Sequence, residues 1–592
     1  MNFLKIDILI LLLIQTIWIE GQVNYLPQGM ADHEYKLMDS YLESRSQTKG
    51  ITSPPPFTSL RTAAQWEEVQ ALVITWTGQY NIIQSQIVDA AQEECMVIIH
   101  CSDSSSVKST LSTNGVPLSN IRFLEVNFNS VWIRDYAANS VYADDVDSLI
   151  LVDWIYNRPR PDDDIIPDAY AALLGVPLYS MSQSPNDIMA TGGNWMSDGF
   201  STSFSSNLIL DENDGAGNQS LNYPNHTETE INQLYGDWMG ISNYIKMTNL
   251  PYDDIHHIDM HMKIEDEETL VIGEFPAGTS DGPQMEANIQ YLLSNFTTVW
   301  GDPFKIVRVP MPPSTGGSYA PSSSYRTYAN HIIINKKILL PTYREQYDTI
   351  AIRILQEVHP GHTIVPIDVD NSGQNLIASG GAIHCITHTV GVSDPMWITH
   401  KKLADTFDDV TPYQIEAMIK HKSGIASATM YYKTTFVGSY SPVAMSSIGN
   451  DIWTADIPSQ NVGTSIYYYV EGNSNSGKTL QRPLTAPNGY WKFNVLGSNV
   501  GINELGWHAA LEDIYPNPAT QITVIPINAN KETFGSLIMY NMLGEKVKIL
   551  HEGKFPQYQK NFFIDASNFP AGVYHVVFKS NKNTQSKTLV IQ

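Results

Sequence analysis

Cys385 is the residue in this sequence best suited to act as a nucleophile. The chain has three cysteines, and only Cys385 is flanked by glycines and histidines, in the run Gly-Gly-Ala-Ile-His-Cys at 380–385. Upstream, Asp135 ends the run Trp-Ile-Arg-Asp, and His257 and Asp259 lie two residues apart. A thiol, an imidazole and two carboxylates supply a nucleophile, a proton carrier and anions that can bind a cation. The set indicates chemistry on a guanidinium group, whose planar edge matches a carboxylate.

Each of these residues also has a plainer interpretation when it is taken alone. Cysteine is among the most buried residue types, so Cys385 alone also fits a structural thiol in the core. His257 and Asp259 alternate along a predicted strand, which turns both side chains to one face but also fits a solvated polar edge. Asp135 alone fits an ion pair with residues beside Arg134. The functional interpretation therefore depends on the motifs occurring together.

The other two cysteines are predicted to be core thiols. Cys95 and Cys101 bracket a strand-like run at 96–100. On one extended strand they would lie about 20 Å apart at ~3.3 Å per residue, which is too far for a disulfide. Cys385 is then left unpaired, as a reactive nucleophile must be.

The 592-residue chain is acidic, with a net charge of −26 and 42% hydrophobic residues. This charge argues against nucleic acid or anionic membranes as partners, and it fits a soluble acidic surface. Residues 1–22 are typical of a secretory signal peptide, with Lys5 before an apolar run at 8–19. No other segment approaches ~20 consecutive apolar residues, so the sequence predicts no transmembrane segment.

A Pro-rich N-terminal arm or linker is predicted at 23–56, and a mixed α/β domain at 57–394, where short apolar strands alternate with polar helical stretches. The expected strands lie at 71–76, 96–100, 148–154, 207–210, 269–272 and 331–335, and the expected helices at 80–94, 284–295 and 346–357. A Gly-Gly pair recurs at 192–193, 316–317 and 380–381. Two of these pairs are followed by similar strands, which suggests a ring of repeated modules.

The sequence after residue 394 predicts only strands and turns. Residues 395–497 alternate short strands with turns of Gly, Asn, Ser and Pro, which is typical of an immunoglobulin-like sandwich without a cysteine pair. A linker is expected at 498–511, and 512–592 are expected to form a second, smaller all-β domain.

Taken together, the motifs of the α/β domain resemble the guanidino-modifying superfamily, in particular the agmatine deiminases and the secreted bacterial peptidylarginine deiminases. The resemblance spans about 60–392 and rests on motifs in the family's order: Trp-Ile-Arg-Asp at 132–135, Gly-Gly-Asn at 192–194 with Asp-Gly at 198–199, His-Ile-Asp at 257–259, and Gly-Gly-Ala-Ile-His-Cys at 380–385. It implies a five-bladed α/β propeller with the site at its centre. It also implies these roles: Cys385 as nucleophile, His257 as general acid and then base, Asp135 and Asp259 as guanidinium clamps, and Asn330 as a further active-site residue.

A pair of arginines separates the two branches of this family. Arg158 and Arg160 lie on a loop stiffened by prolines, and together they are suited to bind a carboxylate. Agmatine has no carboxylate, whereas the peptidylarginine branch uses the Asn-Arg-Pro-Arg motif to hold the carboxylate of a C-terminal arginine. Internal pairing with the acidic run at 162–164 is the structural alternative. Trp132 is expected to stack on the substrate's aliphatic stem or cation.

The C-terminal domain carries a resemblance of its own. Its motifs are similar to those of type IX secretion sorting domains: Tyr-Pro-Asn-Pro-Ala at 515–519, Tyr-Asn-Met-Leu-Gly at 540–544, Phe-Pro-Ala-Gly-Val-Tyr at 569–574 and Lys-Thr-Leu-Val-Ile at 587–591. Such a domain implies an address read by the secretion machinery. With the signal peptide, it predicts a secreted or cell-surface protein.

The expected function is hydrolysis of arginine in peptides or proteins to citrulline and ammonia, with preference for a C-terminal arginine and without a metal or organic cofactor. Deimination of agmatine is the nearest alternative. A metallohydrolase is a second alternative, because His257, Asp259 and His261, and also His359 and His362, have metal-ligand types at short spacing. A non-catalytic surface adhesin would rest on the two all-β domains alone.

Overall fold

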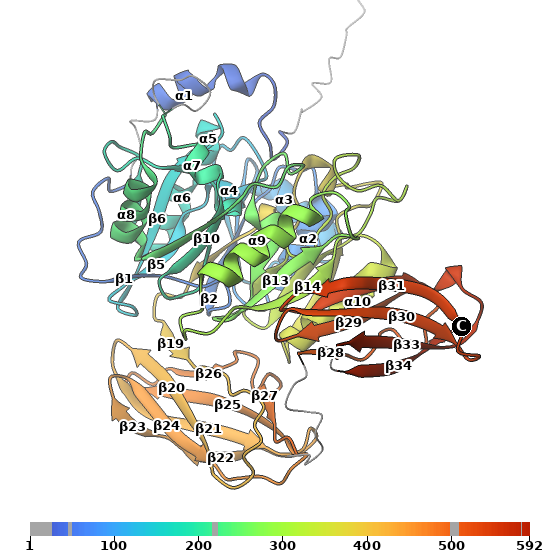
Figure 1. Ribbon diagram of the computed structural model, residues 1–592. Coiled ribbons are helices and arrows are strands. Elements are labelled where there is room, and N and C mark those ends of the chain that lie inside the picture. Colours follow the sequence, from blue (N-terminus) through green and yellow to red (C-terminus); the bar gives the residue numbers. More distant parts are fainter. Residues whose placement is uncertain (1–25, 45–49, 216–222, 498–507, 582) are drawn as a thin grey trace, which may run out of the picture.

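The computed structural model describes residues 26–44, 50–215, 223–497, 508–581 and 583–592. A large α/β region is flanked by two all-β regions, one below it and one to its right in Figure 1. The signal peptide expected at 1–22 lies outside the described residues. So does most of the linker expected at 498–511, although strand β28 (Ala509–Leu511) already begins within that range.

In the described residues, the α/β region contains five small sheets that repeat one pattern. In each sheet one strand pairs antiparallel with one neighbour and parallel with the other. Helices connect the two parallel strands, since a parallel pair needs a long crossover connection. The last strand, β18, pairs with β2 from the start of the region, so the two ends of the α/β region share one sheet. The predicted mixed α/β class is thus confirmed.

The strands of the five sheets are, sheet by sheet, β1 (Leu60–Thr62), β5 (Asn139–Ala143), β6 (Ser148–Tyr156), β7 (Leu178–Met181) and β8 (Met189–Ala190); β9 (Met196–Ser197), β10 (Thr202–Ser206) and β11 (Asn243–Met247); β12 (Met262–Ile264), β13 (Thr269–Glu274) and β14 (Lys305–Pro310); β15 (Ile332–Ile334), β16 (Lys337–Thr342) and β17 (Thr363–Asp368); and β18 (His388–Gly391), β2 (Val69–Thr75), β3 (Met96–Cys101) and β4 (Ile121–Glu125). The helices of this region are α2 (Asn81–Ala91), α3 (Ser104–Thr113), α4 (Ile133–Tyr136), α5 (Pro161–Asp164), α6 (Ile166–Leu174), α7 (Leu208–Asp211), α8 (Glu228–Met239), α9 (Gly282–Asn295) and α10 (Glu345–Val358).

Two predicted strands of this region are wrong, and the first of them lies at 207–210. Residues 207–210 were expected to be extended, but Leu208–Asp211 form the short helix α7. Strand β10 has already ended at Ser206, whose hydroxyl accepts a hydrogen bond from the Leu208 backbone N–H at 3.3 Å. A short apolar run such as Leu-Ile-Leu does not distinguish a buried strand from a buried helical turn by its pattern, because both are apolar on every side.

The first all-β region consists of two facing sheets with an apolar layer between them. Alternation along β20, where buried residues alternate with more exposed ones, shows how the sequence builds this layer. The strands are β19 (Met396–Thr399), β20 (Tyr413–His421), β24 (Ile452–Ile457) and β23 (Ser446–Gly449) in one sheet, and β22 (Ser441–Ala444), β21 (Ile425–Lys433), β25 (Ser465–Ser474), β26 (Thr479–Arg482) and β27 (Trp491–Asn494) in the other.

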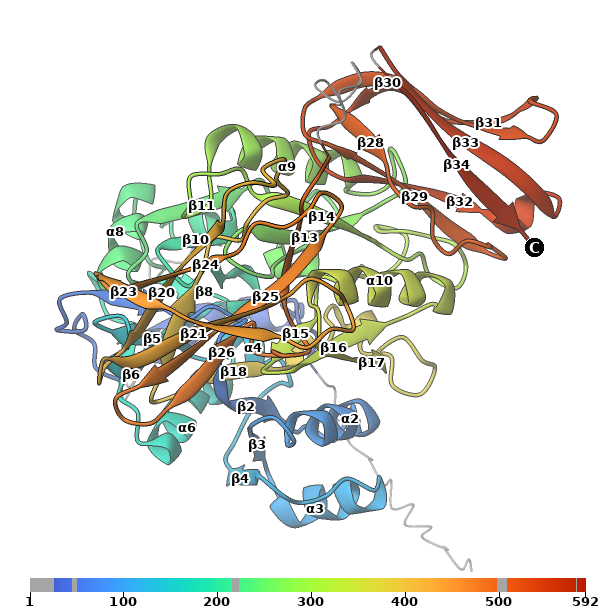
Figure 2. The same ribbon diagram turned by 90° about the horizontal axis from the view of Figure 1, so that it is seen from below.

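The second all-β region also has two sheets and a separate apolar core. Figure 2, seen from below, shows it beside α10 and away from the first all-β region. Its strands are β28, β29 (Ile522–Ala529) and β32 (Lys560–Asp565), and β31 (Lys546–Phe555), β30 (Thr533–Asn541), β33 (Gly572–Ser580) and β34 (Thr584–Ile591).

The two all-β regions contact the α/β region in different ways. Ion pairs join the first, as between Lys420 and Asp145 at 2.7 Å and between Lys402 and Asp266 at 2.6 Å. The second contributes apolar side chains to the main core, and the Arg353 guanidinium of α10 lies 4.1 Å from the ring centroid of Tyr515.

The N-terminal arm, Leu26–Ser44, crosses the α/β region and ends in two short helices, η1 (Glu34–Lys36) and α1 (Met38–Ser44). Met38, Tyr41 and Leu42 are buried against Ile155 and Met189. The arm is therefore packed onto the domain rather than extended away from it. Within the described ranges, no helix is both long and apolar enough to cross a membrane.

Candidate active site

Cys385 is fully buried in the short helix η7 (His384–Ile386). Its Sγ lies 3.3 Å from Nδ2 and 3.4 Å from Oδ1 of Asn330, and 3.8 Å from Oδ2 of Asp259. Asn330 Oδ1 also accepts a hydrogen bond from the His384 backbone N–H at 3.1 Å, which fixes the amide beside the thiol. Three segments that are distant in sequence therefore meet at the sulfur, and each contributes a residue that the sequence predicts for the site.

Asp135 and His257 form the other half of the centre. Asp135 lies on α4, and His257 directly precedes the short helix η5 (Ile258–Met260), with Nδ1 of the imidazole 3.6 Å from Oδ1 of Asp135. A Cβ atom at Gly193 would lie 2.4 Å from His257 Nδ1 and 3.0 Å from Asp135 Oδ1. This Gly-Gly pair is thus required by the close approach of two candidate catalytic side chains and not by the turn alone.

The glycine pair before Cys385 has the same explanation. A Cβ atom at Gly381 would lie 2.7 Å from Cζ3 of Trp132 and 2.9 Å from Cβ of Cys385. The Trp132 ring is fully buried, and its Nε1–H donates to the Leu26 carbonyl at 3.0 Å. Trp132 and Cys385 therefore both lie against Gly381.

The predicted extended backbone at 257–259 is wrong. His256 has a φ of 55°, a left-handed conformation that interrupts an extended chain, and η5 follows. His257 consequently faces Asp135, while Asp259 Oδ2 is 2.7 Å from Nδ1 of His384. His384 belongs to a motif singled out from the sequence, but only the structure reveals it as the partner of Asp259.

Gln28 of the N-terminal arm is the residue of this centre that sequence reasoning missed. Its side chain is fully buried, and Nε2 lies 3.3 Å from Asp135 Oδ2 and 3.4 Å from His257 Nδ1. Its backbone N–H donates to the Ser379 carbonyl at 3.0 Å. A single glutamine in a Pro-rich arm carries no sequence signal that could have identified it.

The two predicted clamp arginines contact the same arm. Arg158 Nε donates to the Gln28 carbonyl at 3.2 Å. Arg160 forms a buried two-pronged pair with Glu34, with Nε 2.8 Å from Oε1 and Nη2 3.0 Å from Oε2. Arg160 thus does bind a carboxylate, but that carboxylate comes from the arm and not from the acidic run at 162–164.

The electrostatics of the centre are dominated by burial. Burial, reinforced by the charges of Asp259 and Asp135, raises the pKa of Cys385 well above its usual range. Burial is also the main cause that lowers the pKa of His257 well below its usual range, and the positive charge of Arg158 adds to it. Burial also raises the pKa of Asp259 strongly and that of Asp135 to about 6. A cation bound between these groups would reverse these shifts, because it favours thiolate and carboxylate.

Hydrogen bonding leaves the same groups unsatisfied. Oδ1 of Asp135, Oδ1 of Asp259 and Nε2 of His257 are buried and have no hydrogen-bond partner among the described residues. Buried polar atoms are rarely left unpaired, so a centre with several of them is built for a ligand that donates hydrogen bonds. A guanidinium group, with five N–H donors in one plane, is such a ligand.

The first metal cluster considered from the sequence is not assembled, because His257 and Asp259 turn to different partners, as described above. The rings of His359 and His362 do lie together, with centroids 5.1 Å apart. His359 also meets Glu265 and His331, and these three residues form the group of possible metal ligands in the described part of the chain. Cys95 and Cys101 are free and buried, as predicted.

Comparison with known proteins agrees with these motifs. Residues 61–390 match the model of the Porphyromonas-type peptidyl-arginine deiminase family. A Mycoplasma mycoides protein whose name assigns it as an agmatine deiminase is 24% identical over 297 residues, covering 45% of this chain and 76% of its own.

Solved structures of agmatine deiminases are also similar to this chain. The Enterococcus faecalis enzyme has 18% identity and a TM-score of 0.48, covering 58% of this chain and 99% of its own. The C. jejuni enzyme has 20% identity and a TM-score of 0.45, covering 56% and 96%.

Residues 513–592 match the secretion system C-terminal sorting domain. A domain of this type indicates export, so the predicted type IX sorting domain is confirmed. The deiminase match covers more than half of the chain and contains every predicted site residue. The chain belongs to the Porphyromonas-type peptidyl-arginine deiminase family and ends in a secretion sorting domain.

Proposed function

We propose that this protein hydrolyses the guanidinium group of arginine in peptides or proteins to citrulline and ammonia, with preference for a C-terminal arginine. One observation carries the proposal: Cys385, Asn330, Asp259, Asp135 and His257 meet in one buried centre whose carboxylates keep unpaired oxygens. A planar cation that donates several hydrogen bonds satisfies these atoms, and the thiol lies beside it as nucleophile.

The first half of the reaction removes ammonia. Asp135 and Asp259 hold the guanidinium, and its charge favours the thiolate of Cys385 while His257 carries the proton. The sulfur attacks the guanidinium carbon to form a C–S bond. The imidazolium of His257 then protonates the departing nitrogen, the C–N bond breaks, and ammonia leaves a covalent thiouronium on Cys385.

The second half restores the enzyme. Neutral His257 takes a proton from water, and the hydroxide adds to the thiouronium carbon. The hydroxyl of this adduct then loses its proton to solvent and the C–S bond breaks, which releases citrulline and returns Cys385 as thiolate and His257 as imidazolium. Asn330, within 3.4 Å of the sulfur, positions the thiol in both halves. None of these steps uses a metal or an organic cofactor.

The preference for a peptide ending in arginine rests on Arg158 and Arg160. Arg160 already binds a carboxylate in this structure, that of Glu34, through two parallel hydrogen bonds. A terminal carboxylate presents the same two oxygens and fits the same fork. Agmatine lacks this group, so deimination of agmatine is the second candidate and is favoured by the relatives named above.

The direct test is citrulline formation from a peptide with a free C-terminal arginine, compared with its amidated form, free arginine and agmatine. The free-terminus peptide should have the highest kcat/KM. Cys385→Ala should form no citrulline from any of them, while Cys95→Ala, which removes a core thiol, should remain active. Preference for agmatine would transfer the assignment to the second candidate.

We further infer that the five sheets are the blades of a five-bladed α/β propeller, and that residues 395–497 are an immunoglobulin-like module. The repeated strand order supports the first and the two facing sheets the second. A signal peptide at 1–22, together with the sorting domain, would deliver the enzyme to the cell surface or the surrounding medium.

A further inference from the structure

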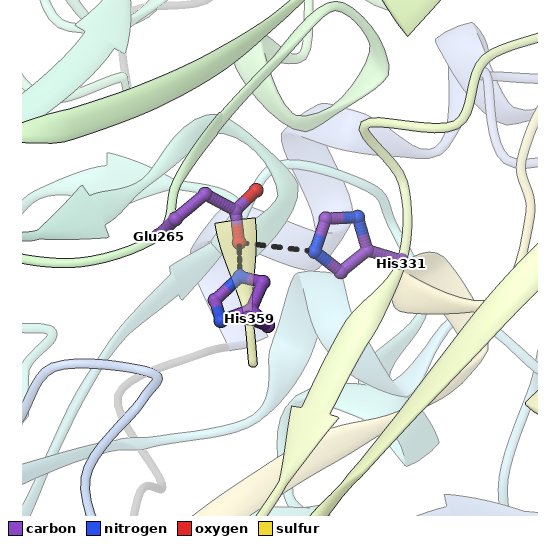
Figure 3. Close-up of side chains that lie close together, drawn as sticks. All are labelled: Glu265, His331 and His359. Carbon is purple, nitrogen blue, oxygen red and sulfur yellow. Dashed lines mark hydrogen bonds and ion pairs between the residues drawn. The ribbon is translucent and has the colours of Figure 1, made fainter. Parts of the chain in front are cut away.

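We propose that Glu265, His331 and His359 bind one divalent transition-metal ion, with zinc as the preferred metal, next to the candidate active site. Figure 3 shows the three side chains pointing toward one another. Their possible ligand atoms all lie within 4.8 Å of one another, and all three residues are buried. They come from three segments: the end of β12, the start of β15 and the end of α10.

The hydrogen bonding of His331 is the first reason to place a cation here. Its Nδ1 is 2.9 Å from the Tyr328 carbonyl, which can only accept, so Nδ1 carries a hydrogen. In the neutral ring, Nε2 then presents a lone pair to the Glu265 carboxylate, 3.2 Å away. Two acceptors facing each other repel unless a cation lies between them. A ring that donates through Nδ1 to a carbonyl and binds through Nε2 is the usual arrangement of a metal-ligating histidine.

The Glu265 carboxylate is the second reason. The residue is 1% exposed, and its Oε1 has no hydrogen-bond partner in the described residues. Among the described residues, this carboxylate forms ion pairs with His331 at 3.2 Å and with His359 at 2.7 Å. Lys263 interacts with this carboxylate only over a longer distance. A buried carboxylate without a lysine or arginine in direct contact needs another source of positive charge, which either two protonated imidazoles or a metal ion can supply.

The geometry and ligand types favour zinc. Ligand atoms about 2.0–2.1 Å from a tetrahedral zinc lie roughly 3.3 Å apart. The separation between Glu265 and His331 already matches this value, and that between Glu265 and His359 would have to widen by about 0.6 Å. Two imidazoles and one carboxylate suit zinc better than calcium or magnesium, which prefer oxygen ligands.

A fourth ligand position can be reached from solvent. Glu265 and His359 line a cavity of about 430 Å³ between the α/β region and the first all-β region. Three cations of the all-β region also line it, and two of them, Lys402 and Arg482, are paired with Asp266 and Glu267 rather than with Glu265. Water can therefore complete the coordination.

The site would stabilise the loop that carries Asn330, because His331 follows directly and Asn330 contacts the sulfur of Cys385. Its role is thus positional, whereas the binding of the ion itself does not depend on the reaction proposed above.

The test is zinc binding by the full chain in a Cys385→Ala background, which removes the thiol of the candidate active site as a competing zinc ligand. After chelation and dialysis, the chain should bind one zinc ion, and its Tm should rise with zinc concentration, since zinc binds the folded state. Glu265→Gln and His359→Asn should each weaken binding at least ~10-fold and lose the Tm increase. His226→Ala, which removes a histidine paired with Asp187, should bind zinc as the parent does.

Absence of zinc binding in the parent would leave Glu265 held by protonated imidazoles and would overturn the proposal. Equal binding by the parent and both variants would do the same. If Glu265→Gln does not fold, His359→Asn decides alone, because His359 lies at the end of α10 and is 8% exposed.

A separate set of contacts concerns the arm. We also infer that residues 26–44 block the candidate active site as a pseudosubstrate; this inference rests on the function proposed above. The Gln28 amide donates toward Asp135 and His257, where the guanidinium would bind. The Glu34 carboxylate is paired with Arg160, at the place where the terminal carboxylate of the substrate would bind. The arm thus fills both ends of the proposed substrate position.

Several further contacts hold the arm in place. Arg160 Nη2 donates to the carbonyls of Pro27 and Gly29, at 2.8 and 3.1 Å. Farther along, the Tyr41 hydroxyl donates to the Tyr156 carbonyl at 3.1 Å. A substrate peptide and the arm cannot occupy these positions together, so the arm must move before a substrate binds.

Two readouts on the full chain test this. Glu34→Ala and Gln28→Ala should each raise the rate at which iodoacetamide alkylates Cys385 by roughly tenfold, as expected for the loss of charge-assisted hydrogen bonds. Alkylation of Cys95 and Cys101 should not change. Asp39→Ala, an exposed position on α1, is the matched control and should behave as the parent. Glu34→Ala should also raise kcat/KM for citrulline formation.

The outcomes separate the two ideas. If both variants are alkylated faster but no citrulline forms from any substrate, the result would support inhibition by the arm and reject the proposed function. Unchanged alkylation and unchanged turnover in both variants would reject the arm as an inhibitor.

Discussion

The α/β region and the two all-β regions differ in how many charged side chains they bury. The centre of the α/β region buries Arg134, Asp135, Asp259, Lys263 and Glu265 within one core. The cores of the all-β regions are built of apolar residues, and buried polar side chains are few in their described parts.

This difference distinguishes a region built for chemistry from regions built for packing. Burial lowers the pKa of Lys263 to about 7 and that of Arg134 to about 10, which shows how strongly the α/β core disfavours isolated charge. A protein keeps such a costly arrangement where a ligand or a reaction uses it. Facing sheets whose strands alternate buried and exposed residues carry no such cost.

Loss of the thiol should produce the largest contrast. Cys385→Ala should reduce citrulline formation by roughly 10⁴-fold or more, because the covalent step disappears. Its Tm should change little, since the substitution removes one sulfur atom from a centre that is already strained by buried charge. Cys101→Ala, at the end of β3, should show the opposite pattern, with activity kept and Tm lowered. Turnover by purified Cys385→Ala near that of the parent would end the thiol mechanism.

Two glycines that lie against neighbouring side chains, one in the α/β region and one in the first all-β region, extend this comparison. Gly193→Ala places a methyl group 2.4 Å from His257 Nδ1 and should lower kcat by roughly 10²-fold through displacement of the imidazole. Gly472→Ala, in β25, places one 2.8 Å from Ile419 and 2.9 Å from Met396. It should destabilise the first all-β region by about 1–3 kcal/mol and leave kcat near that of the parent.

Both variants need activity and thermal unfolding measured on the same preparation. Equal losses of activity would mean that Gly193 serves packing only, and that the short distance to His257 has no catalytic consequence.

The same contrast explains what the sequence could predict. Strands β2 and β13 were predictable because their runs are apolar and well bounded, and Cys385 and His257 were predictable because their residue types allow little else in that combination. The backbone conformation at His256 was not predictable, because a positive φ at a non-glycine residue leaves no trace in the pattern of apolar and polar residues. The contacts of Gln28 and Glu34 were not predictable either, because they depend on where the arm lies and not on the neighbouring residues in sequence.

The clamp arginines should show a smaller, substrate-dependent effect. Loss of one charge-assisted contact costs ~1.5–3 kcal/mol, which is roughly ten- to hundredfold in kcat/KM. Arg158→Ala and Arg160→Ala should therefore lower kcat/KM for peptides with a free C-terminal arginine and should affect amidated peptides and agmatine far less. Because any effect on the arm acts on all substrates alike, the ratio between free and amidated peptides isolates the clamp. An unchanged ratio in both variants would refute it.

Removal of the sorting domain should have the smallest effect on catalysis. Residues 513–592 pack against α10 and β14 through Tyr515 and Tyr558 and contribute no side chain to the candidate active site among the described contacts. A chain that ends at residue 512 should therefore keep its kcat within about twofold, although its Tm should fall because the covered face of α10 becomes exposed. In the native cell, the same chain should accumulate inside.

Arg353→Ala is the control for the lost packing. It removes the guanidinium that lies 4.1 Å from the Tyr515 ring and should loosen this contact while leaving the sorting domain on the chain. Export of Arg353→Ala with retention of the truncated chain would assign export to the domain itself, since both proteins share the weakened interface. If the truncated chain is exported as well as the parent, the domain is not the address, and its packing against α10 is its remaining role.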